Sequence, residues 1–404
     1  MRGGRGGLLG ALRHRDFRLY CAGQIVSLLG TWMQSVAQAW LVYRLTGSGA
    51  ALGVVGAAGL LPVLAFGLAG GMLADRLPRR ALFAGTQLLA AALAAALAAL
   101  TLTGAVRAWH VAAVATALGL VHAVEIPTRH ALVGGLVPRE SLPNAVGLNS
   151  ALFNLARFAG PALAGLLVRH WGEGPVFALN AVSYLAVVAA VAAMSPAADG
   201  KARAGRREAP GALAYAAGDR EVLCALAVLA AGSLGGGAYT VVLPLITDRV
   251  LGAGPGTLGA LMAAAGGGAL VGALALATRG RPEGLARLSR RSAAGIALGL
   301  ALLALATHPL AAGAATAFLG FCTTSLVAST NAYLQVRVPD RVRGRLMALA
   351  ATTFMGALAV GQLAGGGLAD LAGPRAAVAL AALPVLAGLA AVLSRRPRRR
   401  APPP

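Results

Sequence analysis

The stretch Gly71-Met72-Leu73-Ala74-Asp75-Arg76-Leu77-Pro78-Arg79-Arg80 joins two apolar segments, each long enough to cross a lipid bilayer. It holds one acid and three arginines. Because arginines cross hydrocarbon only at high cost, they place this turn on the cytoplasmic side. Asp75 ends its apolar segment at a helix C-terminus, where the helix dipole disfavours a negative charge, so it needs a cationic partner elsewhere. The stretch therefore predicts a cytoplasmic elbow between two membrane helices.

The apolar character continues along the chain of 404 residues. Hydrophobic residues make up 58% of it and charged residues only 12%, and the mean hydropathy is +0.74. Uncharged runs of about twenty residues recur, the length that a helix needs to cross about 30 Å of hydrocarbon. We expect an all-α polytopic membrane protein with two pseudo-symmetric six-helix bundles. Its twelve transmembrane spans are approximately 17–43, 50–75, 81–103, 108–131, 144–168, 174–194, 221–247, 256–278, 290–307, 309–335, 345–371 and 375–394.

The basic residues orient these helices. If the N-terminus is cytoplasmic, 29 of the 35 Lys and Arg residues lie in inside segments, five lie outside, and Arg157 lies within the membrane. This bias places both termini in the cytoplasm. We also expect the chain to lie in the inner membrane of a bacterial cell. The net charge of +22 does not indicate nucleic acid as a partner, because the basic residues lie in short loops without interleaved aromatic residues.

A shift of 201 residues aligns the chain with itself without a gap. The shift superimposes Gly71 on Gly272, Val137-Pro138 on Val338-Pro339, and Gly160 on Gly361. Transporters built from two such repeats place a site near the midplane between the halves. We expect an N-terminal bundle at 1–194, a cytoplasmic linker at 195–219, a C-terminal bundle at 220–396 and a basic, proline-rich tail at 397–404.

The elbow resembles the loop between the second and third helices of the major facilitator superfamily. By that resemblance its gating residues are Gly71, Asp75, Arg76, Arg79 and Arg80. Further stretches are similar to the enterobactin-exporter and macrolide-efflux branch of the superfamily, of the drug:proton antiporter type. They are 12–19 (LRHRDFRL), 30–34 (GTWMQ), 45–48 (LTGS), 136–140 (LVPRE), 144–146 (NAV) and 335–340 (QVRVPD). This resemblance implies a twelve-helix exporter driven by the proton gradient, without a cofactor, and it does not name the cargo.

The fifth span is similar to the antiporter motif of the superfamily's exporters, with alanine at two of its glycine positions. The matching residues are Gly147, Gly160, Pro161 and Gly165. Ala156, Gly160 and Ala164 also recur every four residues and form a flat stripe on which another helix can pack closely. Ordinary packing of small residues is the alternative interpretation of this stripe.

Two charges within the spans are candidates for proton coupling. Arg157 lies about 18 Å deep at 1.5 Å per residue, where a charge is costly and needs a partner. The best candidate partner is Glu125, and we hypothesise that protonation of Glu125 frees Arg157 to bind an anionic or polar cargo. His122, one turn earlier, is a candidate to share the proton. The alternative is local: Glu125 pairs with Arg129 four residues later, and His122 only packs.

Polar faces mark candidates for a central cavity. The first span carries Gln24, Ser27, Thr31, Ser35 and Gln38 on one face, although serine and threonine hydroxyls also bond to their own helix backbone. Asn154 shares a stripe with Arg157. By the repeat, Asn331 and Gln335 are further cavity candidates.

Asp75 has a candidate partner on span eleven, which we expect to begin near Arg345. The dipole of that helix N-terminus, with Arg343 or Arg345, favours a carboxylate there. Such a contact acts as a latch in the outward-facing conformation only. The repeat places Leu276 at the equivalent position, so this latch is one-sided.

These features favour a secondary active transporter that exports small amphiphilic molecules, drug-like or siderophore-like, by alternating access with proton antiport. The alternatives are an importer or a lysolipid flippase of the same fold, and a membrane sensor or scaffold without transport. An enzyme is not expected, because no nucleophile, base and orienting group fall together. Three distant cysteines and six scattered histidines match no metal site. The expected partners are a small-molecule substrate and the lipid bilayer, and the expected state is a monomer.

Overall fold

The structure is a computed structural model that describes residues 10–195, 212–278 and 283–394. Within these residues twelve helical spans are long and apolar enough to cross a membrane, which confirms the predicted fold class. The helices are α1 (Arg15–Thr46), α2 (Gly49–Arg76), α3 (Arg79–Leu102), α4 (Ala108–Gly135), α5 (Leu142–Trp171), α6 (Glu173–Ala192), α7 (Ala212–Gly218), α8 (Arg220–Leu245), α9 (Pro255–Ala277), α10 (Leu285–Leu305), α11 (Pro309–Arg337), α12 (Asp340–Ala372), α13 (Pro374–Leu380) and α14 (Ala382–Leu393).

The helix ends follow from local sequence. α1 ends where Gly47 takes a left-handed conformation (φ 61°), which glycine adopts without strain. Ser48 then caps α2, because its Oγ accepts a hydrogen bond of 3.2 Å from the N–H of Ala51. α12 begins at Asp340 rather than near Arg345 as expected, since Pro339 occupies its N-cap and an acid suits its first turn.

Two further differences from the expected spans are local. A single turn of π-helix (Ile246–Val250) extends α8, and the last span divides into α13 and α14 at Ala381. The expected linker, 195–219, lies mostly outside the described residues, and its end forms α7.

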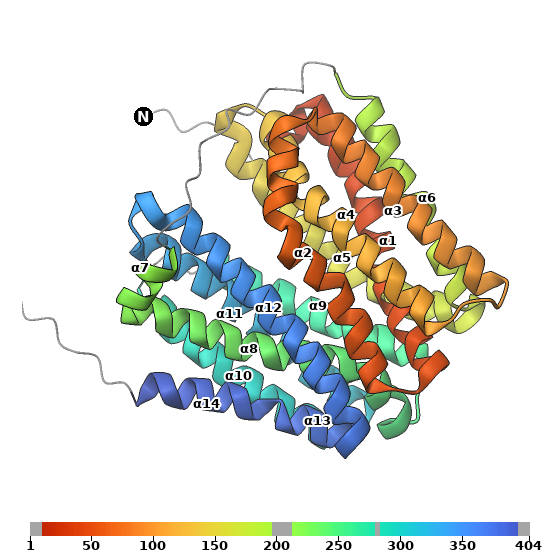
Figure 1. The fold of residues 1–404 in the computed structure, drawn as a ribbon, viewed down its shortest axis with the longest axis vertical. Helices are drawn as coiled ribbons and strands as arrows, with labels where there is room; N and C mark the ends of the chain where they lie inside the picture. Colours follow the sequence, from red (N-terminus) through yellow and green to blue (C-terminus); the bar gives the residue numbers. More distant parts are fainter. Residues whose placement is uncertain (1–9, 196–211, 279–282, 395–404) are drawn as a thin grey trace, which may run out of the picture.

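The helices gather in two halves, α1–α6 and α8–α14 (Figure 1). The main contacts between the halves are α2 against α12 and α5 against α9. Under the shift of 201 residues, α2 corresponds to α9 and α5 to α12. The two contacts are therefore copies of one another, as expected for a molecule made of two repeats.

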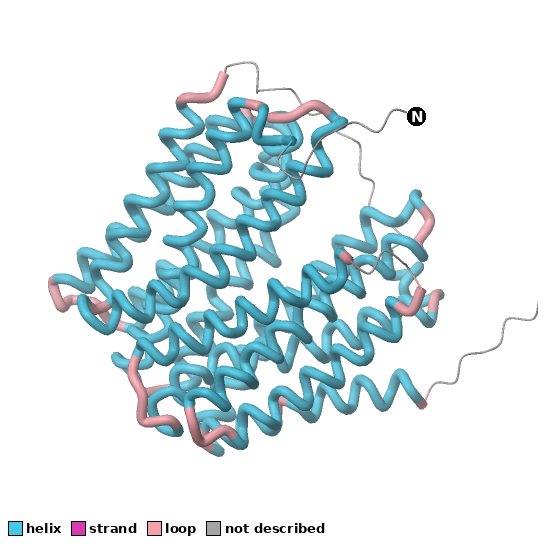
Figure 2. The backbone as a smooth tube through the Cα atoms, turned by 180° about the vertical axis from the view of Figure 1, so that it is seen from behind, coloured by secondary structure: helices cyan, strands magenta, loops and turns pink. Residues whose placement is uncertain are grey.

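The two ends of the bundle differ. We call the end with the turn between α2 and α3 the elbow face and the opposite end, with the turn between α1 and α2, the far face. At the far face Tyr43 Oη donates a 2.5 Å hydrogen bond to Asp248, and Arg249 Nη2 donates one of 2.6 Å to the Gly47 carbonyl. Toward the elbow face the halves diverge, as Figures 1 and 2 show from opposite sides. The structure is closed at the far face and open at the elbow face.

Candidate functional site

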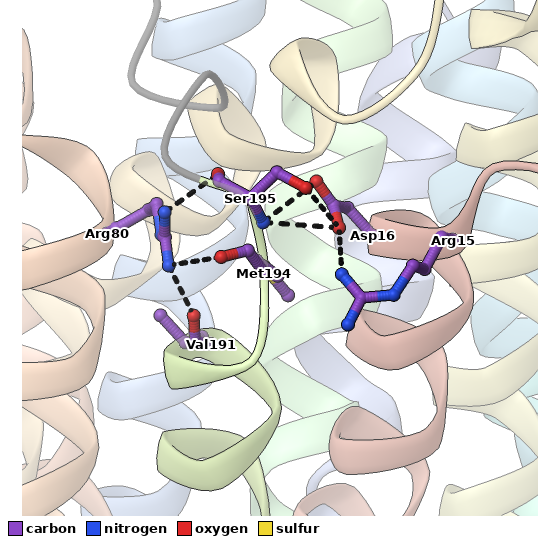
Figure 3. A network of polar contacts seen from close by, with 6 residues as sticks. All are labelled: Arg15, Asp16, Arg80, Val191, Met194 and Ser195. Atoms are coloured by element: carbon purple, nitrogen blue, oxygen red, sulfur yellow. Dashed lines mark hydrogen bonds and ion pairs between the residues drawn. The ribbon is translucent and has the colours of Figure 1, made fainter.

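Two of the three elbow arginines, Arg79 and Arg80, hold the N-terminal half together. Arg80 donates hydrogen bonds of 2.8 Å to the carbonyls of Val191 and Ser195, and of 2.9 Å to that of Met194 (Figure 3). Arg79 reaches the carbonyl of Ala131 on α4 at 3.2 Å. The last carbonyls of a helix have no partner within the helix, so a guanidinium satisfies them well. These two arginines therefore fix α3 to α6 and α4.

Asp75 has no hydrogen bond or ion pair within the described residues, and its side chain is exposed. Its expected partner Arg343 instead pairs with Asp340 on the same helix and donates to the Val338 carbonyl at 3.3 Å. Gly71 and Arg76 also face open space or solvent. The expected latch between Asp75 and Arg343 or Arg345 is not formed in this conformation. It was expected only in the opposite one, so it stays a prediction.

Arg157 lies at the middle of α5 between the two halves. Its guanidinium carbon is 5.8 Å from the ring centroid of Trp32 on α1, a cation–π contact. The Trp32 ring meets Phe153 edge-on at 5.7 Å. Arg157 is also close enough to Tyr239 on α8 for its charge to act on that hydroxyl. Among the described residues no carboxylate pairs with Arg157.

Glu125 lies inside the N-terminal half, only 6% exposed. Its Oε1 is 3.5 Å from Arg129 Nη1 on the next turn of α4. The expected pair with Arg157 is thus absent, and the local pair is formed because residues four apart share one helix face. His122 is half-buried and lies within the reach of both charges. Tyr184 of α6 also lies within reach of the Glu125 charge.

Part of the polar face of α1 packs inside the N-terminal half: Gln24 and Ser27 are buried, whereas Thr31, Ser35 and Gln38 are half-buried. Thr31 Oγ1 donates to the Ser27 carbonyl at 2.9 Å and lies 3.3 Å from the Tyr184 hydroxyl of α6. Gln24 is 3% exposed, and its Oε1 has no hydrogen-bond partner. α6 packs along α1 and meets this face where Tyr184 lies near Thr31. The role of these residues in a central cavity stays a prediction.

The other cavity candidates are less enclosed. Gln38 is half-buried in α1. Asn154 donates to the Ser150 carbonyl of its own helix at 2.9 Å. Asn331 is half-buried and Gln335 exposed near the elbow-face end of α11.

The small residues of α5 serve close helix packing. A Cβ on Gly160 would lie 2.6 Å from the Trp32 Cβ, and one on Gly165 would lie 2.9 Å from the Cα of Gly259 on α9. The Pro161 carbonyl faces the same glycine of α9, whereas Gly147 has no neighbour within 4 Å. The antiporter-like residues therefore join α5 to α1 and to the other half.

Sequence reasoning missed four residues of the C-terminal half that the structure brings to the space between the halves or to the far face. Tyr239 lies opposite Arg157, and Gln362 of α12 is partly buried with an Oε1 that has no partner. Asp248 and Asp370 join the halves at the far face. Only Asp370 carries a signal in the sequence, because it ends a second Gly-Gly-x-Leu-Ala-Asp stretch like that of the elbow.

Comparisons with known proteins show the family to which the chain is related. The family model described as transmembrane secretion effector matches residues 7–401. The multidrug efflux pump Tap of Mycolicibacterium fortuitum is 30% identical over 88% of this chain and 90% of its own length. Macrolide efflux protein A of Streptococcus pyogenes is 29% identical, but the match spans only 42% of each chain.

The fold also matches solved structures. The nucleoside transporter NupG superimposes with a TM-score of 0.73 over 94% of this chain and 98% of NupG, at 12% identity. The matched family and relatives are transporters rather than enzymes, and the twelve apolar helices make this chain a multi-pass membrane protein. The chain belongs to the transmembrane secretion effector family of the major facilitator superfamily.

Proposed function

We propose that this transporter exports a small amphiphilic molecule from a bacterial cell by alternating access, in exchange for protons. The observation that carries the proposal is Arg157, a guanidinium at mid-depth between the halves that has an aromatic ring beside it and no carboxylate partner among the described residues. A charge at that depth is costly unless it serves a site.

The state of the molecule suits the loading of cargo from inside. The bias of basic residues toward the elbow face makes that face cytoplasmic, and the halves diverge there. On this orientation the structure is inward-open. The efflux proteins among its relatives support export as the direction.

The chemistry around Arg157 favours a cargo with one anionic or strongly polar group and an apolar body. The guanidinium offers a fork of hydrogen-bond donors, while Trp32 and Phe153 offer ring surface next to it. Tyr239 approaches from the other half. A molecule bound there would touch both halves and would move with their rearrangement.

Glu125 is the proposed proton carrier. It is buried, and its contact is with Arg129, so protonation would release Arg129 rather than Arg157. The half-buried His122 and the buried Tyr184 lie within reach of its charge and complete a polar cluster inside the N-terminal half. A change of charge there would alter how α4 packs within this half, which is how we propose that proton uptake biases the conformation.

The test uses everted membrane vesicles, in which respiration acidifies the interior. Erythromycin, the carboxylate-bearing antibiotic fusidic acid and a fluoroquinolone serve as probes. We expect at least one of them to accumulate in vesicles that contain the protein, and a protonophore to abolish this accumulation. Vesicles without the protein are the control. Accumulation of none of them, or accumulation that the protonophore leaves unchanged, would overturn the proposal.

A further inference from the structure

The same six-residue pattern ends both α2 and α12. Residues 70–75 read Gly-Gly-Met-Leu-Ala-Asp and residues 365–370 read Gly-Gly-Gly-Leu-Ala-Asp. The shift of 201 residues does not relate the two, because it places Arg169 at the equivalent of Asp370. Since α2 and α12 run antiparallel against each other, one pattern lies at the elbow face and the other at the far face.

At the far face the pattern binds the other half. Asp370 accepts hydrogen bonds of 2.6 Å from Ser48 Oγ, 2.6 Å from the N–H of Gly49 and 2.9 Å from the N–H of Ala50. These are the free donors at the start of α2, where the helix dipole also favours a negative charge. The carboxylate at the end of α12 thereby caps a helix of the opposite half.

Glycines allow the two backbones to meet at this point. A Cβ on Gly366 would lie 2.1 Å from the Gly49 carbonyl oxygen, and one on Gly49 would lie 2.5 Å from that of Gly366. One turn deeper, a Cβ on Gly53 would lie 2.6 Å from the carbonyl oxygen of Gln362. No side chain fits at these positions while the contact is closed.

At the elbow face three corresponding positions are glycines with no neighbour, while the counterpart of Gly49 is Asp340, which pairs with Arg343. Gly71 corresponds to Gly366, and Gly67 lies one turn before it, as Gln362 does before Gly366. Neither Gly67 nor Gly71 has a neighbour within 4 Å of an added Cβ. On α12, Gly344 is five residues after the N-cap, as Gly53 is on α2, and it also has no neighbour within 4 Å.

The first glycine of each pattern behaves differently from the second. A Cβ on Gly70 would lie 2.1 Å from the Ala123 carbonyl oxygen of α4, and one on Gly365 would lie 2.6 Å from the Ala238 Cα of α8. Both contacts are within one half. The first glycine therefore allows each helix to pack closely within its own half. The second glycine faces the other half: Gly366 is in contact with it, and Gly71 is not.

We propose that the two patterns are alternating latches, and that Asp370 and Gly366 are positioning residues for alternating access. In the far latch, Gly366 and Asp370 of α12 contact the start of α2, and this contact is formed in the present structure. In the elbow latch, Gly71 and Asp75 of α2 would contact the start of α12 near Gly344, and this contact is open in the present structure. Because α2 and α12 are long, stiff helices, rocking that closes one latch opens the other. This deepens the proposed function, on whose alternating access it rests.

The test measures distances between spin labels by electron paramagnetic resonance, with the protein in lipid nanodiscs. The labels are attached to a variant in which Cys21, Cys224 and Cys322 have been replaced. Exposed pairs report each face: Trp109 with Leu310 at the far face, and Glu140 with Val336 at the elbow face. For Asp370→Asn we expect the ratio of molecules that are open at the far face to molecules that are closed there to rise by about tenfold or more. The reason is that the variant loses a charged acceptor of three hydrogen bonds. The elbow-face distance should shorten in the same molecules.

The double variant Asp75→Asn/Asp370→Asn separates a latch from a merely structural role, because loss of both latches should return the ratio toward that of the native protein. Glu173→Gln is the matched control, since Glu173 is a buried far-face carboxylate whose partner, Arg44 at 2.9 Å, lies in its own half. It should leave both distances unchanged.

Unchanged distances in Asp370→Asn would overturn the proposal, as would a double variant that matches Asp370→Asn alone. The measurement needs no cargo, so its failure would leave the export proposal standing. Conversely, if the distances change as expected but no export is found, only the proposed cargo and direction of transport would be overturned.

Discussion

The guanidinium of Arg157 lies 5.8 Å from the ring centroid of Trp32, so that α5 and α1 present a cation and an aromatic face side by side at mid-depth. Tyr239 of the opposite half lies near the same cation.

Arg157→Gln should reduce transport of an anionic cargo by about tenfold or more, because a hydrogen bond to a charged group is lost. Arg157→Lys retains the charge and should retain part of the activity. The measurement compares accumulation of fusidic acid, if it is transported, with that of its uncharged methyl ester in everted vesicles. An equal loss for both compounds would contradict recognition of the anionic group.

Glu125→Gln should abolish proton-driven accumulation of the cargo. Exchange of internal for external cargo across the membrane of proteoliposomes, without a proton gradient, should stay intact. The amide cannot take up a proton, but it preserves the size of the side chain next to Arg129. Glu140→Gln, on an exposed turn, is the control. Unchanged proton-driven flux in Glu125→Gln would remove this residue from the mechanism.

Asp75→Asn should lower transport while expression and membrane insertion stay normal. The side chain is exposed and makes no contact in the present conformation, so the substitution should not weaken this state. It would instead weaken the outward-facing state, in which the carboxylate meets the start of α12. Full transport activity in this variant would refute the elbow latch.

Arg80→Ala should lower the melting temperature of the detergent-solubilised protein on the order of 5 °C, because three carbonyls at the end of α6 lose a charged donor. Arg76→Ala is the matched control from the same elbow, since Arg76 is exposed and has no contact in the described residues. Equal melting temperatures for both variants would contradict an anchoring role for Arg80.

Asp219→Asn should destabilise the protein at neutral pH but not at low pH. Partial burial alone raises the pKa of the Asp219 carboxyl, but hydrogen bonds from Arg337 and from the N–H of Val222 lower it, and the net pKa falls below its ordinary value of 3.8. A lowered pKa in the folded state gives stability that is present above pH 3.8 and is lost as the pH falls through the folded value.

We expect the melting temperature of the Asp219→Asn variant to be about 2–4 °C below that of the native protein at pH 7. The two melting curves should converge as the pH falls below 3.8 and through the lowered pKa of the folded state. A difference in melting temperature that does not shrink as the pH is lowered below 3.8 would show that the effect comes from packing rather than from the charge.

The positions of the helices were predictable because each span depends on local properties. Hydropathy placed all twelve within five residues, and the elbow and the shift of 201 residues are visible in the chain itself. The small-residue stripe of α5 was likewise predictable as a packing surface, since Ala156 and Ala164 are fully buried.

The partners of individual side chains were not predictable. Glu125 had two candidate cations, and only the packed helices show that Arg129 is the one it meets. Thr31 was expected to line a central cavity, but its hydroxyl lies near that of Tyr184 on α6, because hydropathy does not encode how a helix is rotated against its neighbours.

The sequence by itself therefore determined the number of membrane crossings, the repeat and the family resemblance, since composition and short motifs carry that information. Only the tertiary structure decided which face of the bundle is closed and which carboxylate closes it. Asp370 and Gly49 are 321 residues apart and meet at 2.6 Å. Such a contact depends on how two rigid halves are tilted, and no local pattern in the chain specifies that tilt.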